Sequence, residues 1–510
     1  MKKLSLGIAA LALTVCAYAQ KNIHPEKYAK YISAEDARKH LSILASDEYE
    51  GRETGKPGAD KAANYIANEF KKLGLQAPVS GSYFFDVPLV ENTTKISFTV
   101  SGQAVNNGQD FFTRSSVADK LISAEEFVFV GYGTDTEIAN TDIKGKVILW
   151  INEDKPQEGK PANTSYRLST ARTQIIKNLQ SKGPELILAA NPEVADVLKK
   201  FGSTILGGRL TIKQDVAKPL SPLAATLNIT TSVADQLVKS SGKSFADLKN
   251  AAAQTIKADI KLDMRTETKD VKAVDVLGFL PGSDLKDEVL VFSAHYDHIG
   301  LNPNGSDKVN NGADDDGSGT TGILEIAKAF TQAKKDGHGP RRSVLFLANV
   351  GEEKGLLGSE YYTDHPVFPL ANTITDLNID MIGRVGFDYI GKADSANYVY
   401  TIGSAMLSKE LHQINEAANT KYTHLDQDYK YDDPNDPNRF YYRSDHYNFA
   451  KHGVPIIFYF NGVHADYHQP GDEVSKINFP LLAKRAQLVF YTGWELANRD
   501  KRPVVDAPAK

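Results

Sequence analysis

The stretch that decides the fold reads EVLVFSAHYDHIG at residues 288–300, then a polar loop, then NNGADDDGSGTTGILEIAKAF at residues 310–330. Residues 288–294 form a short apolar run, which predicts a buried strand that ends on a group of histidines and acids. The apolar spacing after Asp316 predicts an amphipathic helix. Three adjacent aspartates, Asp314–Asp316, stand at its entrance. Because helix capping needs only one carboxylate and like charges repel, we expect a cation to hold the others.

Other predicted strands also end on acids or histidines. They are residues 343–350 (SVLFLANV) before Gly351, Glu352 and Glu353; residues 373–380 (TITDLNID), ending on Asp380; and residues 454–460 (VPIIFYF) before His464, Asp466 and His468. Ligands of open α/β sheets bind beyond the carboxyl ends of the strands, so these side chains are expected to converge. Imidazole and carboxylate ligands suit zinc better than magnesium or calcium, with cobalt or manganese as alternatives.

The order of strands and helices after about residue 271 predicts the fold class. Strand-like and helix-like patterns alternate to the end of the chain, with covering helices at residues 404–419 and 480–497. This alternation is typical of an α/β fold with a doubly wound, mostly parallel sheet and helices on both faces.

The sequence resembles the dizinc aminopeptidase family, typified by bacterial secreted leucyl aminopeptidases. It has that family's motifs in order: H-x-D, G-A-D-D-D-x-S-G, G-E-E, a lone aspartate after a strand and a late histidine. The resemblance implies a zinc exopeptidase fold and two Zn²⁺ ions per chain. It implies that His295 and Asp380 hold one zinc, that Glu353 and His468 hold the other, and that Asp315 bridges both. It also implies a cis peptide bond between Asp315 and Asp316.

The catalytic roles follow from the same resemblance and from chemistry. Glu352 is predicted to be the general base that activates a metal-bridging water. Asp297 is placed to accept the second imidazole N–H of His295 and so fix its tautomer. Tyr441 or Tyr442 is a candidate to stabilise the oxyanion, and the sequence does not decide between them.

The remaining histidines and the acidic loop have weaker interpretations. His298, His446 and His464 are interpreted as ordinary hydrogen-bonded or packing residues. Arg52 and Glu53 either reach the site or form a solvated turn. Residues 426–443 are acidic and rich in Pro and aromatic residues, and we interpret them as a surface loop near the site because their spacing does not match an EF-hand.

These residues predict an enzyme, a metallo-exopeptidase that removes N-terminal residues from peptides. Carboxypeptidase and glutaminyl cyclase activities, which occur on the same fold, are the alternatives. A non-catalytic, receptor-like relative would lack several ligands, and this chain lacks none of them. The sequence determines neither the side-chain specificity nor the oligomeric state.

Composition sets the broader limits. The chain has 510 residues, 41% hydrophobic and 24% charged, with a formal net charge of −5, which gives no case for nucleic acid as a partner. Residues 1–19 have the basic start, apolar core and Ala-x-Ala end of a signal peptide, so we expect an exported, periplasmic or secreted protein. The apolar run is too short to favour a membrane span. Cys16 is either a lipidation site or, since Val15 is a poor residue before one, part of the apolar core.

The domain organisation is expected to be discontinuous. Residues 20–120 would be the N-terminal part of the peptidase domain, residues 121–265 an insert, and residues 266–510 the main dizinc domain. The pieces FVFVGYGT, DIKGKVILW and GPELILAANPE of the insert resemble the protease-associated domain. We interpret the insert as a lid or substrate-positioning element, with a passive spacer as the alternative.

Overall fold

The computed structural model describes residues 24–113, 119–156, 163–206, 208–214, 223–303, 305–393, 395–433 and 435–507. The predicted signal peptide and Cys16 lie outside these ranges. The chain divides into unit 1, Met1–Val87 with Ala273–Lys510, and unit 2, Pro88–Lys272. The range predicted for the insert, residues 121–265, lies inside unit 2.

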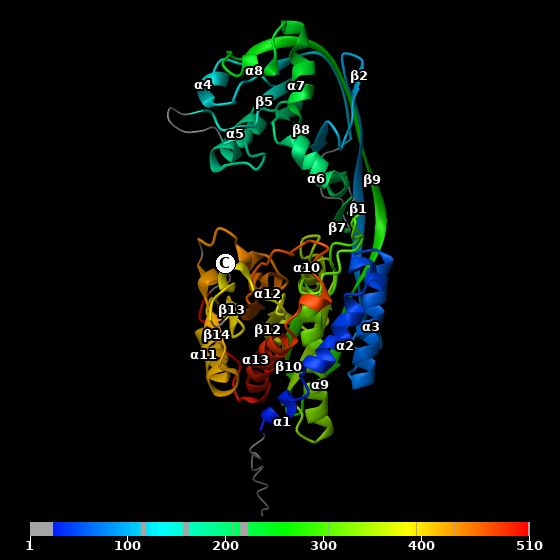
Figure 1. Cartoon of the computed structure of the whole chain (residues 1–510), viewed down its shortest axis with the longest axis vertical. Helices are drawn as coiled ribbons and strands as arrows, with labels where there is room; N and C mark the ends of the chain where they lie inside the picture. Colours follow the sequence, from blue (N-terminus) through cyan, green and yellow to red (C-terminus); the bar gives the residue numbers. More distant parts are fainter. Residues whose placement is uncertain are drawn as a thin grey trace, which may run out of the picture. The chain divides into compact units, whose positions relative to one another are not determined.

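Unit 1 is built on one sheet (Figure 1). Its strands, in sheet order, are β14 (Asp426–Asp428), β13 (Tyr398–Ile402), β15 (Ile456–Phe460), β12 (Thr373–Ile379), β10 (Leu285–His295), β11 (Arg342–Asn349) and the end of β9 (Gln254–Leu280). The central pairs β10–β11, β10–β12 and β12–β15 are parallel, whereas β9 and β13 join antiparallel. The predicted doubly wound, mostly parallel sheet is therefore confirmed.

Helices cover both faces of this sheet. They are α1 (Glu26–Ala29), α2 (Ala34–Leu44), α3 (Pro57–Leu73), α9 (Gly317–Lys335), α10 (Leu357–Asp364), α11 (Lys409–Ala418), α12 (His446–Lys451) and α13 (Phe479–Asn498). Helices α9 and α13 pack on one face, where Phe292 of β10 stacks on Phe346 and contacts Phe330 of α9. Val289 and Val291 alternate to the other face and pack with Tyr362 of α10 and Phe449 of α12. This two-sided burial explains why β10 reads as an unbroken apolar run.

The register of the central strands positions the site. His295 at the end of β10 lies opposite Asn349 of β11, and Ser293 lies opposite Asn378 of β12. The parallel strands therefore end together, and the residues that follow each of them meet at one edge.

Unit 2 contains both parallel and antiparallel strand pairs. Its strands are β1 (Phe84–Val100), β2 (Gln103–Val105), β3 (Phe111–Thr113), β4 (Lys120–Phe129), β5 (Val147–Ile151), β6 (Leu186–Ala190), β7 (Arg209–Ile212), β8 (Ala225–Ile229) and the first part of β9. Its helices are α4 (Asp135–Ile138), α5 (Thr170–Ser181), α6 (Val194–Leu206), α7 (Thr231–Val238) and α8 (Phe245–Leu248). Strands β5, β6 and β8 are parallel; β5 and β6 are apolar and buried throughout, and Trp150 of β5 belongs to one of the buried clusters of the unit.

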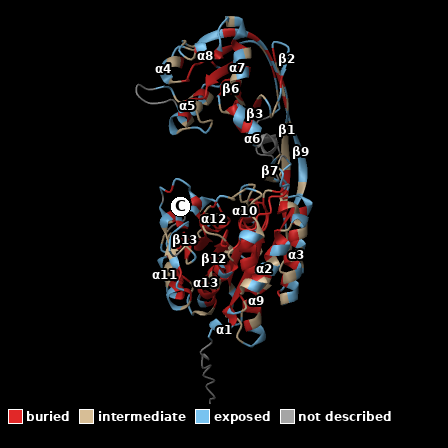
Figure 2. Ribbon diagram, in the orientation of Figure 1, coloured by how far each residue is buried: buried red, intermediate tan, exposed pale blue. Residues whose placement is uncertain are grey.

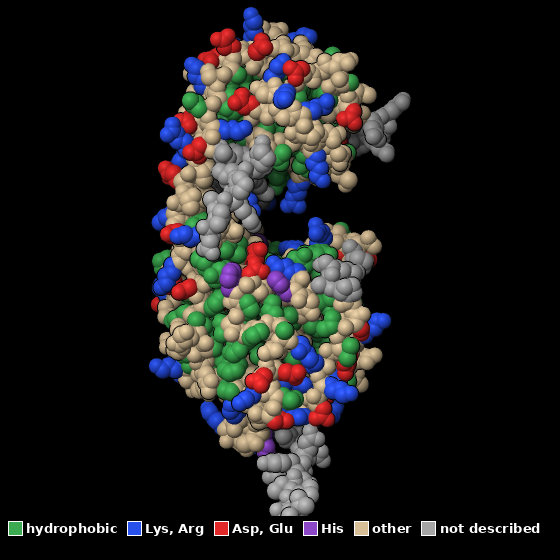
Figure 3. Space-filling view, turned by 180° about the vertical axis from the view of Figure 1, so that it is seen from behind, with side chains coloured by type: hydrophobic (Ala, Val, Ile, Leu, Met, Phe, Trp, Pro, Cys, Tyr) green, Lys and Arg blue, Asp and Glu red, His purple; other side chains and the backbone are tan. Residues whose placement is uncertain are grey.

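Burial follows this plan within each unit: the sheets are buried and the outward faces of the helices are exposed (Figure 2). Lys, Arg, Asp and Glu side chains are interspersed over the face drawn in Figure 3, in keeping with the small net charge. Among the described residues, none of the helices has the length and apolar character needed to cross a membrane.

Candidate metal centre and active site

The first group of ligand atoms gathers around His295. Its Nε2 atom lies 3.5 Å from Asp315 Oδ1 and 3.7 Å from Asp380 Oδ2. His295 ends β10, Asp315 precedes α9, and Asp380 follows β12, so three separate strand and helix ends supply the group. His295 Nε2 is buried and has no hydrogen-bond partner.

The second group shares Asp315. His468 Nε2 lies 3.1 Å from Asp315 Oδ2 and 3.0 Å from Glu353 Oε2. His298, which the sequence analysis left as an ordinary histidine, is also in this group, because its Nδ1 lies 2.9 Å from Glu353 Oε1. Asp315 therefore presents one oxygen to each group, as a bridging carboxylate does.

The donor set fits a pair of zinc ions. Ligand atoms around a tetrahedral zinc, at bonds of about 2.0–2.1 Å, lie roughly 3.3 Å apart. The distances above, 3.0 to 3.7 Å, bracket that value. A buried imidazole nitrogen without a hydrogen-bond partner is costly unless something binds it. His295 Nε2 is such an atom, which supports a metal at the centre of the first group.

Asp297 holds the site in a different way from the one expected. The Nδ1 atom of His295 lies 3.1 Å from the main-chain oxygen of Asp297, whereas the Asp297 carboxylate is 3.7 Å away. The carbonyl therefore accepts the imidazole N–H and leaves Nε2 for the metal. The carboxylate accepts hydrogen bonds from Thr54 Oγ1 and from the backbone N–H of Glu352. Asp297 thus ties the loop after β10 to the loop that carries Glu352.

Asp316, the neighbour of Asp315, caps a helix. Asp316 is the N-cap of α9 and accepts from Gly319 N, and the same oxygen accepts from Met381 N next to Asp380. The Asp315–Asp316 peptide bond is cis, as expected from the sequence.

Arg52 is neither a substrate-facing group nor a solvated residue. Its side chain is 1% exposed and donates to the carbonyls of Leu44, Tyr296, Asn311 and Gly312. The carbonyl of Tyr296 directly follows His295, and those of Asn311 and Gly312 shortly precede the aspartates. Arg52 therefore fixes the two segments that carry ligands relative to each other.

The electrostatics match a cation site. Burial acts to raise the pKa of Asp315, but His295 and His468 outweigh it and hold that pKa well below its usual value. Burial alone would lower the pKa of His468, but Glu353 and Asp315 raise it to about 10. Concentrated carboxylate charge that draws protons onto histidines also attracts a divalent metal. For Glu352, burial raises the pKa well above its usual value and His295 only partly offsets this.

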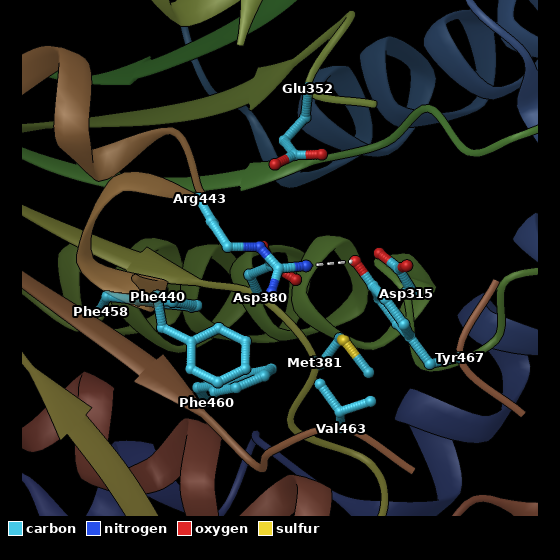
Figure 4. Close-up of a pocket in the computed structure, with 10 residues that line it drawn as sticks. All are labelled: Asp315, Glu352, Asp380, Met381, Phe440, Arg443, Phe458, Phe460, Val463 and Tyr467. Carbon is cyan, nitrogen blue, oxygen red and sulfur yellow. Dashed lines mark hydrogen bonds between the residues drawn. The ribbon is translucent and has the colours of Figure 1, made fainter. Parts of the chain in front are cut away.

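A pocket opens beside the ligands (Figure 4). It is lined by Asp315, Glu352, Asp380, Met381, Phe440, Arg443, Phe458, Phe460, Val463 and Tyr467. The Tyr467 hydroxyl lies 3.0 Å from an Arg443 guanidinium nitrogen, and both groups face the carboxylates.

The pocket lining does not include either tyrosine singled out from the sequence. The Tyr441 ring packs against the apolar clusters beneath the pocket, and Tyr442 is 39% exposed. Sequence reasoning missed Tyr467 and Arg443. The only local signal was that Tyr467 directly precedes His468, and in the structure the two rings stack with centroids 3.9 Å apart.

Comparisons with known proteins identify similar sequences. Residues 275–493 match Peptidase family M28. A probable leucine aminopeptidase 2 of Aspergillus oryzae is 27% identical over 379 residues, which are 65% of this chain and 70% of that protein. Further curated relatives match over about half of their length, as for leucine aminopeptidase 2 of Trichophyton equinum, with 52% covered.

Solved structures share the fold. An aminopeptidase from Aneurinibacillus sp. strain AM-1 superposes with a TM-score of 0.58 at 19% identity, over 96% of this chain and 100% of that one. A zinc aminopeptidase from Bacillus subtilis superposes with a TM-score of 0.53 at 18% identity, over 94% of this chain and 97% of that one.

Fold and site together define a class, the metallo-exopeptidases, as predicted from the sequence. Within that class, residues 275–493 of unit 1 match the model of Peptidase family M28.

Proposed function

We propose that the protein is an exported zinc aminopeptidase that hydrolyses N-terminal residues from peptides. The observation that carries the proposal is the pair of ligand groups sharing Asp315, with Glu352 and an apolar pocket beside them. His295, Asp380 and Asp315 would hold one zinc, and Glu353, His468 and Asp315 the other. When bound, the zinc ions would polarise the scissile carbonyl and make a water molecule acidic enough to attack near neutral pH.

Glu352 is the general base in this proposal. Its carboxylate points into the pocket and lies 3.9 Å from His295 Nε2, so it stands close to the ligands. It takes a proton from the attacking water and delivers it to the departing amine. The high pKa that burial gives Glu352 suits a group that must hold this proton between the two steps.

Tyr467 is the proposed oxyanion donor. Its hydroxyl lies on the side of the pocket opposite Glu352 and beside Arg443 (Figure 4). The neighbouring guanidinium favours a hydroxyl that donates away from it, toward the oxygen of the scissile carbonyl.

The pocket wall sets the proposed side-chain preference. Met381, Phe440, Phe458, Phe460 and Val463 are apolar and line one side of the pocket. An aliphatic or aromatic N-terminal side chain would bury its surface there, at about 25 cal/mol per Å². We therefore expect leucine, methionine or phenylalanine to be preferred over charged residues at the substrate's N-terminus.

The carboxyl groups in the pocket support cleavage at the amino end of the substrate. Glu352 and Asp380 line the pocket together, and their carboxyl oxygens are hydrogen-bond acceptors for a free α-amino group. The test is to compare leucyl p-nitroanilide with its N-acetyl form. We expect only the free amine to be cleaved at a substantial rate. Equal rates, or preference for a blocked peptide with a free C-terminus, would favour a carboxypeptidase, in which Arg443 would hold the carboxylate.

The reaction product distinguishes a glutaminyl cyclase from an aminopeptidase or a carboxypeptidase. Incubation with a peptide that begins with glutamine would then release ammonia and form a cyclic N-terminus, rather than free glutamine.

The proposal of export depends on residues 1–19. If the signal peptide is removed as proposed, protein recovered from outside the cytoplasm will begin at Gln20. Unit 2 is proposed to limit which peptides reach the site, by resemblance to protease-associated domains. Comparing a tripeptide with a long peptide as substrates would reveal such a size limit.

A further inference from the structure

His298 is a buried histidine beside the metal ligands with no role in the function proposed above. It is the last residue of the His295–His298 segment and its side chain is 0% exposed. Its Nδ1 atom lies 2.9 Å from Glu353 Oε1 and 3.8 Å from Asp315 Oδ2. Its Nε2 atom has no hydrogen-bond partner. His298 could therefore either bind a metal itself or hold a residue that does.

The distances favour the second role. His468 Nε2 lies within 3.0 to 3.1 Å of a carboxylate oxygen of both Glu353 and Asp315, which is the spacing of atoms around one ion. His298 Nδ1 makes one short contact only, and it uses the other oxygen of Glu353. One oxygen of Glu353 therefore faces His468 while the second is occupied by His298. When one oxygen of a carboxylate accepts a hydrogen bond, the carboxylate is oriented so that its other oxygen can bind a metal.

The backbone around His298 keeps the imidazole in place. The backbone N–H of His298 donates to the backbone carbonyl of Arg52, whose side chain connects the loops that carry the ligands. A Cβ atom on Gly312 would lie 2.5 Å from the His298 ring, so the aspartate loop packs directly on that ring. The imidazole has little room to swing toward the ligands, and its contact with Glu353 is preset by the fold.

We propose that His298 is a positioning residue for the second metal site: its Nδ1–H donates to Glu353 Oε1 and directs Glu353 Oε2 to the ion held with His468 and Asp315. The inference rests on the proposed function, because it assumes that this group binds zinc. It predicts that substituting His298 weakens the affinity for one zinc ion and leaves the affinity for the other unchanged.

The experiment measures metal binding and needs no substrate. Full-length protein stripped with chelator is titrated with Zn²⁺ against a chromophoric competitor, and with Co²⁺ monitored by visible absorption. His298→Asn retains an N–H donor near the Nδ1 position. His298→Gln moves the donor further from the backbone, and His298→Leu removes it. His464→Asn is the matched control, because His464 is also buried against a carboxylate, Asp314, that belongs to neither ligand group.

We expect His298→Gln and His298→Leu to weaken one of the two zinc-binding steps by about 10–100-fold, the usual effect of losing a contact to a ligand. His298→Asn should bind nearly as the wild type does, and His464→Asn should leave the affected step unchanged. If His298→Leu does not fold, the comparison of Asn with Gln still decides the question.

Two results would overturn the inference. Wild-type affinity in all His298 variants would make the contact with Glu353 irrelevant to the metal. Complete loss of one ion in all of them, including His298→Asn, would make His298 a ligand. A wild-type protein that binds a single zinc would instead contradict the two-metal function itself.

Discussion

The two units of the chain use buried polar groups in opposite ways. In unit 2, the parallel strands β5 and β6 also end in polar residues, but those residues satisfy one another: Arg172 donates to the main-chain and side-chain oxygens of Asn152, and Asn191 donates to the same carbonyl. In unit 1, His295 Nε2 and Asp315 Oδ2 are buried without hydrogen-bond partners.

This difference separates structure from function. A parallel sheet with polar strand ends is common to both units, so the architecture does not mark the site. Buried histidine and carboxylate atoms that cluster closely enough to hold one ion do mark it. Both metal-ligand groups found among the described residues lie in unit 1. The predictions below test whether unit 1 carries the chemistry and unit 2 only its own stability.

The largest effect is expected from removing metal. Dialysis against a chelator should abolish hydrolysis, and adding Zn²⁺ should restore it, because the carboxylates and histidines of unit 1 act through the ions. Unit 2 should keep its fold, measured as an unchanged unfolding transition for that part of the chain. Full turnover after metal analysis has confirmed removal would contradict the metal centre.

Glu352→Gln should lower kcat by about 10²–10⁴-fold, because glutamine cannot accept the proton of the attacking water. Both zinc ions should remain bound in this variant. Glu353→Gln is the matched control, since it should weaken one metal site instead. Near-normal kcat in Glu352→Gln, or metal loss from it and not from Glu353→Gln, would mean that the two roles are exchanged.

Tyr467→Phe should lower kcat by about 10²–10³-fold, the usual effect of losing one oxyanion donor. KM should change little, because the ring still packs in the pocket. Tyr442→Phe serves as the control, as Tyr442 is exposed and outside the pocket lining. A large loss of kcat in Tyr442→Phe with none in Tyr467→Phe would restore the original sequence interpretation.

In unit 2 we expect an effect on stability alone. Trp150 is fully buried, donates from its indole nitrogen to the Tyr132 carbonyl, and lies in the cluster with Ile148 and Leu179. Trp150→Ala should destabilise the unit by about 3–5 kcal/mol through the cavity it leaves. The folded variant should keep its metal and its kcat for small substrates. Exposed Leu121→Ala is the control and should shift the unfolding free energy by no more than about 0.5 kcal/mol.

The smallest effect concerns a buried acid of unit 1 outside the site. Glu325 accepts from Ser33 N, and burial raises its pKa to about 7. Because this pKa is above the unfolded value of about 4.3, the stabilisation is fully present below pH 4 and is lost as the pH rises through 7. Glu325→Gln should therefore lose less stability than the wild type between pH 5 and pH 8.

Urea unfolding at several pH values and constant zinc measures this difference. Glu35→Gln, at an exposed position of α2, is the control and should follow the wild-type curve. Parallel curves for the wild type and Glu325→Gln would show that Glu325 does not titrate in this range.

Much of the fold could be predicted from the sequence because it is encoded locally. Each central strand was recognised within a few residues of its observed bounds, since burial on both faces favours apolar residues. Strand β12 also buries Asp376 and Asn378, which accept hydrogen bonds from Ser293 Oγ. Helix α11 begins later than expected, at Lys409, because Ser408 is its N-cap and accepts from Leu411 N. The side chain of a serine stops a helix from extending further back.

Part of the site could not be predicted in this way. The sequence suggested that the Asp297 carboxylate faces His295, but the loop turns so that its carbonyl does. Asp297 then becomes a link to Glu352, a contact between residues 55 positions apart. Arg52 was ambiguous for the same reason, since Tyr296, Asn311 and Gly312, three of its four partners, lie more than 240 residues away in the sequence.

The sequence by itself determined which residues can bind metal and where strands end, because ligand chemistry and apolar periodicity are properties of a few neighbouring residues. Only the tertiary structure decided which hydroxyl reaches the pocket, that His298 holds Glu353, and that Met381, Phe440 and Val463 form one apolar wall. Those relations join residues from the ends of different strands. Their distances depend on strand register and loop packing over the whole sheet, which no local pattern specifies.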